Sequence, residues 1–367
     1  MDAVAPTPPR HVIVCGAGVV GASVAYFLAL RGVTVTILER SGVACAASGK
    51  SGGFLALDWC DDSVLGPLAR ASFALHAGLA GELKGDYGYR RVDTFMMVAR
   101  EQGSLPGGHR IAPPSWLDGA GIVHAALGST ETTAQIHPAR FTQALVDGAR
   151  AHGATLRIGT VEAVLIGEGT ARGVRVDGAE LEADAVVLAM GPWTGKLSRA
   201  LGLPRVRGLK GYSVTLVGAS VPAHALFVDY RTADGRHLEP EIFPRPDGDV
   251  YICGMADPAP LPERPEDVTV DAGACDVLAR AGARVSTELA KARIERRQAC
   301  YRPVTDDNVP LIGRVPGASG AYVATGHGPW GMLNAPATGL ALAELIADGR
   351  ARAVDLRPFA PDRLGGP

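Results

Sequence analysis

The sequence predicts an α/β fold of two units, one built on a parallel sheet and the other an α+β unit around a mixed sheet. Three observations lead to this prediction. The chain opens with a strand, a glycine-rich turn, a helix and a second strand, which is the unit from which parallel sheets are built. Later segments alternate between helical runs and short strands separated by turn residues. Finally, a chain of 367 residues is too long for one small domain and suits two.

The stretch from His11 to Arg40 carries the most specific pattern. Gly16, Gly18 and Gly21 stand at GxGxxG spacing between a short apolar run and a helical run. Together with an acidic residue at the end of the next strand, this spacing predicts a Rossmann-type dinucleotide-binding unit. The expected elements are strands at Val12–Cys15 and Val33–Leu38, closed by Glu39, and a helix at Val19–Leu30, ended by Gly32.

Each glycine of this motif has its own physical task. Gly16 permits the tight turn, Gly18 lets the backbone approach a pyrophosphate, and Gly21 lets the helix pack on the strand. The helix N-terminus offers free N–H groups to phosphate oxygens, and Glu39 is placed to accept hydrogen bonds from a ribose. The residues expected to contact the dinucleotide here are Gly16, Ala17, Gly18, Val19, Val20, Gly21, Glu39 and Arg40.

A second glycine-serine loop follows about ten residues after the acidic strand end. It is either a flexible linker or a loop whose backbone amides wrap a pyrophosphate and a flavin ring, and its position favours the second interpretation. Lys50 would add positive charge there. The residues concerned are Ser48, Gly49, Lys50, Ser51, Gly52 and Gly53.

The rest of the chain alternates between the two units. Thr155–Ala163 predicts a strand of the parallel sheet, short runs up to Leu181 predict an antiparallel meander, and Ala185–Met190 predicts a buried strand. Residues 205–300 read as a mixed or antiparallel sheet followed by a helical pattern from Asp271 to Ile294. A third glycine turn at 326–331 then precedes a helix expected at Met332–Asp348.

Composition excludes several classes of protein. The net charge of −2 and the absence of a basic stripe argue against nucleic acid as a partner. No apolar run approaches the roughly 20 residues of a membrane span, and the N-terminal tail lacks a secretory or transit pattern. We therefore expect a cytoplasmic protein, with an organellar location left open. The six cysteines include no CxxC pair, so we expect reduced thiols and no metal site.

Five further motifs occur in a fixed order along the chain: ASGKSGG, IHPARFTQAL, VVLAMGPWTG, ACYRPVTDDNVPLIG and GHGPWGMLNAPATG. Together with the first glycine motif they resemble the FAD-dependent amine and D-amino-acid oxidoreductase superfamily. Glycine oxidases, sarcosine oxidases and the small subunits of D-amino-acid dehydrogenases belong to it. The resemblance spans nearly the whole chain and is far more specific than the first motif alone.

The resemblance implies a D-amino-acid-oxidase-like fold with FAD as cofactor. An FAD-binding domain would comprise residues 1–84, 135–204 and 300–367, and a substrate domain residues 85–134 and 205–299. The closing helix would aim its N-terminus at the flavin, where a partial positive charge stabilises the reduced ring. Further cofactor contacts are then expected at Val161, Gly191, Trp193, Cys300, Gly313, Gly326, His327, Gly328, Trp330, Gly331 and Met332.

Arg302 is the first candidate for substrate binding. It lies in a Cys-Tyr-Arg-Pro stretch that is similar to the Leu-Arg-Pro stretch of glycine oxidases, where the arginine clamps the substrate carboxylate. A planar guanidinium suits this task because it makes two parallel hydrogen bonds to a carboxylate. The alternative is an ordinary surface ion pair. Pro329 stands where glycine oxidases often have an arginine, so a second carboxylate contact is not expected from it.

For the other candidate site residues, a purely structural role competes more strongly with the functional one. Cys300 matches the cysteine that carries covalent flavin in monomeric sarcosine oxidases, but a buried, unreactive cysteine is the commoner state. Lys210 and Tyr212 either face the flavin ring or pack structurally. His327 either acts as an acid or base or contacts the flavin only through its backbone. Phe243 and Tyr251 read as ordinary strand aromatics rather than walls of a pocket.

The expected function is an FAD-dependent oxidoreductase. It would oxidise the C–N bond of a small amino acid or secondary amine by hydride transfer to flavin, and the imine would hydrolyse to an oxo acid. Its partners would be this small molecule and either molecular oxygen or an electron carrier. Two alternatives stay open: a dehydrogenase of amino or 2-hydroxy acids with an acceptor other than oxygen, and a flavin-binding regulator or scaffold without turnover.

Overall fold

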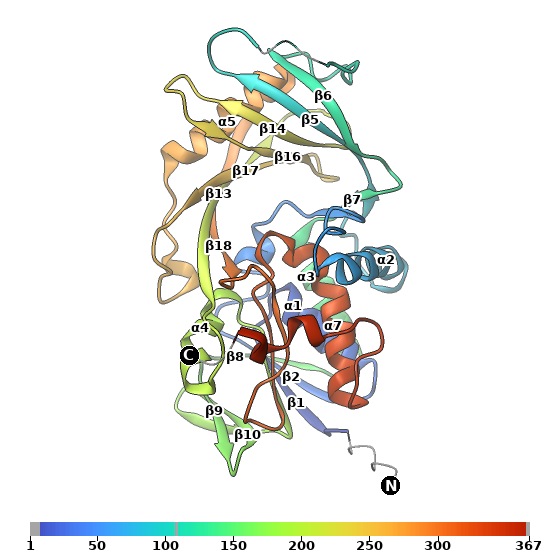
Figure 1. The fold of residues 1–367 in the computed structure, drawn as a ribbon, viewed down its shortest axis with the longest axis vertical. Coiled ribbons are helices and arrows are strands. Elements are labelled where there is room, and N and C mark those ends of the chain that lie inside the picture. Colours follow the sequence, from blue (N-terminus) through green and yellow to red (C-terminus); the bar gives the residue numbers. More distant parts are fainter. Residues whose placement is uncertain (1–7, 106, 108, 365–367) are drawn as a thin grey trace.

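The chain forms two halves that meet along a cavity. The computed structural model describes residues 8–105, 107 and 109–364. Figure 1 shows one half, with β1, β2 and the long helices, at the bottom, and a curved sheet in the other half at the top. We call them the parallel-sheet half and the mixed-sheet half, after their principal sheets.

The parallel-sheet half is centred on a six-stranded sheet with the order β19-β20-β12-β1-β2-β8. All neighbouring strands are parallel except β19 and β20, which are antiparallel. The predicted dinucleotide-binding unit is therefore at its centre, and segments far apart in sequence complete it. The strands are β1 (His11–Cys15), β2 (Thr34–Glu39), β8 (Thr155–Ile158), β12 (Ala185–Leu188), β19 (Leu311–Arg314) and β20 (Ala321–Thr325).

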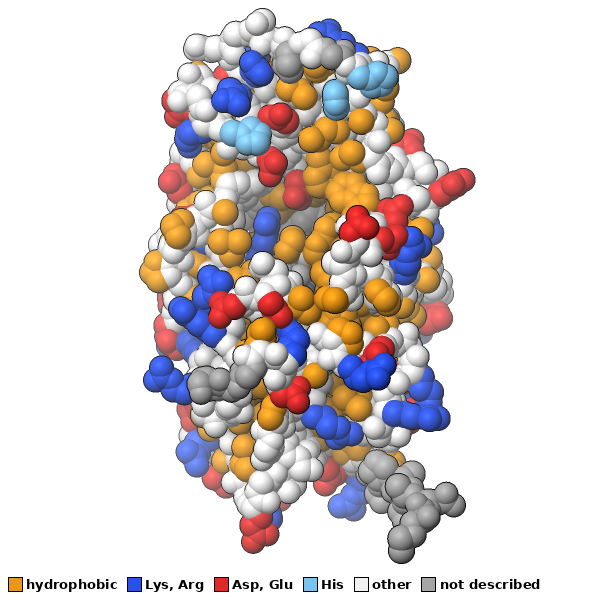
Figure 2. Space-filling view, viewed as in Figure 1, with side chains coloured by type: hydrophobic (Ala, Val, Ile, Leu, Met, Phe, Trp, Pro, Cys, Tyr) orange, Lys and Arg blue, Asp and Glu red, His pale blue; other side chains and the backbone are white. Residues whose placement is uncertain are grey.

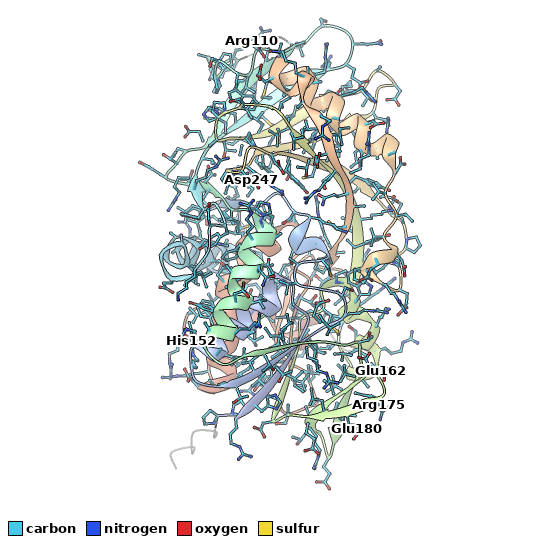
Figure 3. All side chains as sticks on the ribbon, turned by 180° about the vertical axis from the view of Figure 1, so that it is seen from behind. Arg110, His152, Glu162, Arg175, Glu180 and Asp247 are labelled. Carbon is cyan, nitrogen blue, oxygen red and sulfur yellow. The ribbon has the colours of Figure 1, made fainter. Side chains whose placement is uncertain are left out.

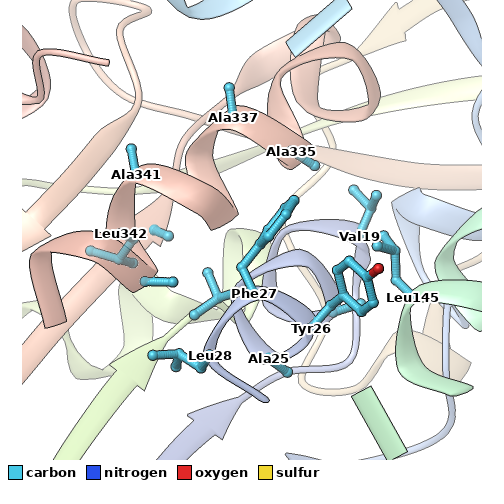
Figure 4. Close-up of a cluster of buried hydrophobic side chains, with 14 of the residues drawn as sticks. Val19, Ala25, Tyr26, Phe27, Leu28, Leu145, Ala335, Ala337, Ala341 and Leu342 are labelled. Atoms are coloured by element: carbon cyan, nitrogen blue, oxygen red, sulfur yellow. The ribbon is translucent and has the colours of Figure 1, made fainter. Parts of the chain in front are cut away.

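Alternating side chains of β1 divide the core of this half into two layers. Val12 and Val14 pack in the cluster beneath the helices, whereas Ile13 and Cys15 pack beneath the meander. Figure 4 shows the helical layer, where Phe27 and Leu28 lie against Ala341 and Leu342. The helices are α1 (Val19–Ala29), α2 (Gly66–Glu82), α3 (Pro138–Ala151) and α7 (Gly331–Ala347); the meander is β9 (Val161–Gly167), β10 (Thr170–Val176) and β11 (Ala179–Glu182).

The strand expected from Thr155 to Ala163 is two strands. β8 ends at Ile158, and β9 starts the meander at Val161. Between them the Gly159 N–H donates to the Glu39 carbonyl at 2.8 Å, and the Thr160 N–H donates to Asp177 Oδ1 at 3.0 Å. These two bonds turn the chain out of the parallel sheet.

The mixed-sheet half contains one large sheet with the order β18-β13-β17-β16-β14-β5-β6, and β15 pairs with β14. β14 and β5 are parallel and the other pairs are antiparallel, so the expected mixed sheet is confirmed. α5 (Ala272–Val285) covers one face, and the other face looks toward the parallel-sheet half (Figure 1). The strands are β5 (Asp93–Arg100), β6 (Gly121–Gly128), β13 (Arg207–Val217), β14 (His224–Arg231), β15 (His237–Leu238), β16 (Glu241–Pro244), β17 (Val250–Asp257) and β18 (Arg293–Val304).

Short elements join the two halves. A small sheet with the order β3-β7-β4 links them on one side. Its strands are β3 (Phe54–Ala56), β7 (Thr133–Gln135) and β4 (Arg90–Arg91), and the remaining α-helices are α4 (Gly195–Ser198) and α6 (Thr287–Lys291). Short 3₁₀ turns lie at Ala47–Gly49, Gly191–Thr194, Arg199–Leu201, Pro265–Asp267, Gly328–Trp330, Arg357–Phe359 and Pro361–Leu364.

The helix expected at Asp271–Ile294 is shorter than its pattern. α5 ends at Val285, α6 ends at Lys291, and the chain then enters β18. β18 pairs with β13 along its whole length, so the boundary expected between residues 299 and 300 falls inside a strand. We therefore propose that the substrate segment extends to Val304.

α7 contains a proline, and α2 compensates for it. Pro336 has no N–H to donate to the carbonyl of Met332, one turn earlier. His76, which is fully buried on α2, places Nε2 3.0 Å from that oxygen. Ser72 of the same helix accepts a hydrogen bond from the Ala337 N–H at 3.1 Å. Because a carbonyl only accepts, His76 is the Nε2–H tautomer, and it fixes the first turns of α7.

We predict that His76→Leu lowers the free energy of unfolding by about 1–3 kcal/mol, because it leaves a buried carbonyl unpaired. The midpoint of urea unfolding measures the effect. Pro336→Ala restores an N–H that can reach Met332, so the cost of His76→Leu should be smaller in that background. Equal costs in both backgrounds would contradict this role of His76.

The same histidine makes stability depend on pH. Burial lowers the pKa of His76 to about 4, whereas an unfolded histidine titrates near 6.5. Between about pH 4 and pH 6.5 the unfolded chain binds a proton at this histidine that the folded chain does not bind. The stabilising contribution of His76 is therefore complete above about pH 6.5 and is lost toward pH 4. The melting temperature should therefore fall less between pH 7 and pH 5 in His76→Leu than in the wild type. The same substitution at the exposed His124 should leave the fall unchanged.

Candidate functional site

One large cavity of about 630 Å³ lies between the two halves. Figure 2 shows a hollow at this level, bordered by hydrophobic side chains. Its walls come from all three glycine turns and from the facing surface of the mixed sheet. Most predicted site residues line it: Gly16, Gly18, Val19, Val20, Glu39, Arg40, Ser48, Lys50, Ser51, Gly52, Gly53, Val161, Gly191, Trp193, Tyr212, Cys300, Arg302, His327, Gly328, Trp330, Gly331 and Met332.

Six predicted site residues do not line the cavity. Gly21 lies behind the first turn, Gly313 is in β19, and the side chain of Lys210 points elsewhere. A Cβ on Gly326 would stand 2.9 Å from Thr305, so this glycine packs inside the parallel-sheet half. The six are Ala17, Gly21, Gly49, Lys210, Gly313 and Gly326.

The first glycine turn has the expected geometry. Gly16 has φ of +109°, and a Cβ on it would lie 2.5 Å from the Ala189 carbonyl oxygen. A Cβ on Gly21 would lie 2.0 Å from the Gly16 carbonyl oxygen, so only glycine allows this helix-to-strand approach. Gly18 lines the cavity at the start of α1. The Val19 N–H donates to Ser48 Oγ at 2.9 Å, which ties the first turn to the second loop.

Glu39 faces the cavity from the end of β2. Its carboxylate accepts hydrogen bonds from the Ala17 N–H at 2.8 Å and from the Ser41 N–H at 2.9 Å. These two donors fix the carboxylate beside the first turn, where Glu39 lines the cavity. This is a position from which Glu39 could accept ribose hydroxyls.

The mixed sheet holds the second loop in place. The Tyr251 hydroxyl donates to the Lys50 carbonyl at 2.7 Å, and Arg245 donates to the Ser51 carbonyl at 2.8 Å. Lys50 Nζ donates to the Ala299 carbonyl at 3.3 Å. The loop is therefore a built wall and not a flexible linker.

A segment of the mixed-sheet half crosses the first-turn end of the cavity. We call residues 258–265 the strap. The Pro262 carbonyl accepts a hydrogen bond from Trp193 Nε1 at 3.0 Å. The Glu263 carbonyl accepts hydrogen bonds from Arg40 at 2.8 Å and from Lys196 at 3.0 Å. Glu263 and Pro265 line the cavity themselves. The strap therefore links the two halves beside the first glycine turn.

The start of α7 forms a further part of the wall. Gly328, Trp330, Gly331 and Met332 line the cavity, and no side chain caps the helix. Its free N–H groups carry the positive end of the helix dipole. His327 is next to them, with Nε2 3.1 Å from Thr338 Oγ1, and burial lowers its pKa to about 4. It is therefore neutral at pH 7, and its role as an acid or base stays a prediction.

Strand register decides which side chains of the mixed sheet reach the cavity. Gly211 pairs with Cys300, Ser213 pairs with Cys253, and Cys253 pairs with Glu241. These four strands thus present one row of side chains to the cavity, with Arg302 two residues after Cys300 on the same face. Glu241 and Cys253 were not among the sequence candidates. A signal that could have found Glu241 is the alternation of side chains along its strand, which places Glu241 on the same face as Phe243, two residues later.

Arg302 enters the cavity as a charged group without a partner. Among the described residues, none accepts a hydrogen bond from its guanidinium, and its Nη2 lies close to Gly211, where an added Cβ would be 3.8 Å away. Burial disfavours its charged form, but neighbouring acidic groups, with the Glu241 carboxylate among them, outweigh this and raise the pKa of Arg302. The alternative of a surface ion pair is wrong, because Arg302 is largely buried and faces the cavity.

Lys210 and Tyr212 do not present their polar atoms to the cavity. Lys210 Nζ is 3.8 Å from Asp257 and 3.3 Å from Thr269 Oγ1. The Tyr212 hydroxyl donates to Asp257, which does not line the cavity, and its ring belongs to the core beneath α5. Both side chains leave β13 on the α5 face, so the structural alternative describes them.

Cys300 does line the cavity, beside Lys50 and Arg302. Burial raises the pKa of its thiol, and the two cations counteract this only in part. A protonated thiol is a weak nucleophile, which favours an unreactive cysteine. Covalent attachment of flavin at Cys300 stays a prediction. All six cysteines have free thiols.

Two searches of the described part of the chain complete the site. Residues 8–105, 107 and 109–364 contain no group of three or more His, Cys, Asp and Glu side chains arranged to hold a metal ion. No helix in these ranges is long and apolar enough to cross a membrane.

Comparison with known proteins gives consistent matches. The family model described as FAD dependent oxidoreductase matches residues 11–345. A Schizosaccharomyces pombe protein named only as an oxidoreductase is 31% identical over 96% of this chain and 98% of its own length. A glycine oxidase of Bacillus licheniformis is 29% identical over 96% of each chain. The crystal structure of glycine oxidase from Geobacillus kaustophilus superposes with a TM-score of 0.78 at 25% identity, covering 98% of this chain and 99% of that one.

The cavity fits an FAD. Its volume is in the range of cofactor sites, and the open space at Gly191 and Gly328, where an added Cβ would meet nothing within 4 Å, leaves room for close approach. Helices α1 and α7 both begin at the cavity, where backbone N–H groups of their first turns can face the cofactor. FAD is therefore the cofactor of this family that these walls are shaped to hold.

We predict that Glu39→Ala weakens FAD binding about 10- to 100-fold, because a charged acceptor of hydrogen bonds is lost. Titration of the apoprotein with FAD, followed by flavin fluorescence, measures the dissociation constant. Glu180→Ala is the matched control, because Glu180 lies at the exposed tip of the meander with Arg175, away from the cavity (Figure 3). Equal weakening by both substitutions would contradict the role of Glu39.

Proposed function

The chain belongs to the FAD-dependent oxidoreductase family, and from this membership we propose that it oxidises the C–N bond of an amino acid or secondary amine that carries a carboxylate. The observation that supports the proposal is the unpaired guanidinium of Arg302 inside the cavity. A buried cation without a partner is costly unless a ligand supplies the anion. Glycine oxidases are among the relatives, which agrees with an amino-acid substrate.

The chain's own residues would bind and orient. Arg302 would hold the substrate carboxylate by two parallel hydrogen bonds and so fix the carbon that bears the amine. Bound FAD supplies the chemistry of this family by accepting a hydride from that carbon. The strap and the second loop would exclude water from the cofactor. The resulting imine would be hydrolysed to an oxo acid.

Aromatic rings indicate the size of the substrate. Trp59 and Phe227 have centroids 4.8 Å apart, and Phe54 stacks on Phe243 at 5.4 Å. These rings, together with Tyr251 and Trp330, line the cavity beside the row that carries Arg302, so the expectation that Phe243 and Tyr251 are not pocket walls is wrong. Burying an apolar group against them contributes about 25 cal/mol per Å². We therefore propose a substrate with an apolar or aromatic side chain larger than that of glycine.

Anaerobic addition of glycine, sarcosine, leucine and phenylalanine, with both enantiomers of the last two, tests the proposal. We expect the absorbance of oxidised flavin to fall fastest with leucine or phenylalanine. Air is then admitted, and rapid return of the absorbance identifies oxygen as the acceptor, whereas slow return indicates an electron carrier. Absence of bleaching with every compound would contradict the proposed function.

We predict that Arg302→Ala raises the KM for the best of these compounds about 100-fold or more, because a buried charge pair with the carboxylate is lost. Steady-state kinetics measures the change. Arg296→Ala is the matched control, since Arg296 is exposed on the same strand. An unchanged KM in Arg302→Ala would remove this arginine from substrate binding.

A further inference from the structure

Glu241 is the second unpaired charge in the cavity. It lies on β16 and lines the cavity, yet no lysine or arginine of the described chain comes within 4.0 Å of it. Its one hydrogen-bond donor there is the Cys253 thiol, at 3.3 Å from Oε2. A thiol is a weak donor, so a carboxylate at this place lacks the compensation that buried charges ordinarily have.

Arg302 and Glu241 face the same space without pairing with each other. They stand on β18 and β16, separated by β13 and β17, and each affects the ionisation of the other. Their charges are too far apart for a salt bridge, although both side chains are partly buried in the wall of the same cavity. A ligand that carries an anion and a cation would satisfy both.

We propose that Glu241 binds the substrate's ammonium group and takes a proton from it, so that the site selects molecules carrying both a carboxylate and an amine. The inference rests on the proposed function. The step is a proton transfer: an N–H bond of the R–NH₃⁺ group breaks, an O–H bond forms on Glu241, and the amine keeps its lone pair. The C–H bond then breaks, its electron pair and hydrogen pass to FAD as hydride, and the substrate leaves as R₂C=NH₂⁺.

The surroundings of Glu241 suit a proton acceptor. Burial raises the pKa of its carboxyl, and Arg302 counteracts this, which brings a carboxylate closer to the range of an effective base. The other titratable groups around it are Cys253 and Tyr251 on β17, Cys300 on β18 and Glu239 before β16. Lys50 and His327 also line the cavity, and Lys50 Nζ donates to the Ala299 carbonyl of β18 at 3.3 Å.

Binding without turnover tests the recognition of the amine. The holoprotein is reduced with dithionite and titrated by calorimetry with three pairs: glycine and acetate, leucine and 4-methylpentanoate, phenylalanine and 3-phenylpropanoate. We expect the wild type to bind at least one amino acid about 10- to 100-fold more tightly than its amine-free partner. Glu241→Gln should abolish this preference and leave the affinity for the amine-free acid in place. Glu239→Gln, which removes a neighbouring exposed charge outside the cavity, should keep it.

The pH profile tests the proton transfer. In the wild type kcat/KM should reach its plateau well below the pKa of the free amine. In Glu241→Gln the plateau should move up to that pKa, since the amine must then arrive deprotonated. A preference that survives in Glu241→Gln, no preference in the wild type, or an unshifted profile would overturn the inference. If an amino acid still bleaches the wild-type flavin in those cases, only the role of Glu241 is overturned and the proposed function stands. If no compound bleaches the flavin, the proposed function itself is contradicted.

Discussion

The antiparallel ladder between β13 and β18 is the constraint on which the site depends. It runs from Arg207 paired with Val304 to Val217 paired with Arg293. At its end Val304 forms a bridge with His327, which ties the ladder to the start of α7. Because side chains alternate along a strand, a slip of one residue would send Cys300 and Arg302 to the face covered by α5. The long ladder therefore fixes both which charges enter the cavity and where they stand relative to the cofactor walls.

Local signals predicted the glycine turns that line the cavity. The turn at Gly16 and the packing at Gly21 are determined by a few consecutive residues, so the spacing of glycines was sufficient. The substrate side depends on pairing between strands distant in sequence. Lys210 and Tyr212 stand beside the cavity-facing Gly211, and only the register shows that their side chains leave on the α5 face. Glu241 was missed for the same reason, because its neighbours in the cavity come from β17 and β18.

The length of β18 illustrates the same limit. The sequence from Arg293 onward is rich in charged residues, and the residues before it have a helical pattern. Local propensity therefore placed the boundary between helix and strand too late in the chain. Pairing with β13 overrides that preference. Short sequence motifs thus determine the cofactor walls of the cavity, whereas the positions of its charged side chains depend on pairing between strands of the folded sheet.

The strap shows how this architecture separates retention of the cofactor from stability of the fold. It is held to the parallel-sheet half by carbonyl contacts and by ion pairs of Glu263, whose side chain is 71% exposed. Exposed ion pairs contribute about 0–1 kcal/mol and weaken in salt. These ion pairs are consequently the salt-sensitive part of the strap's attachment, whereas the hydrogen bonds from Trp193 to Pro262 and from Tyr301 to Pro260 are not. Raised ionic strength would then weaken the strap beside the cofactor before it weakens either sheet, so salt would affect retention of the flavin more than stability of the fold.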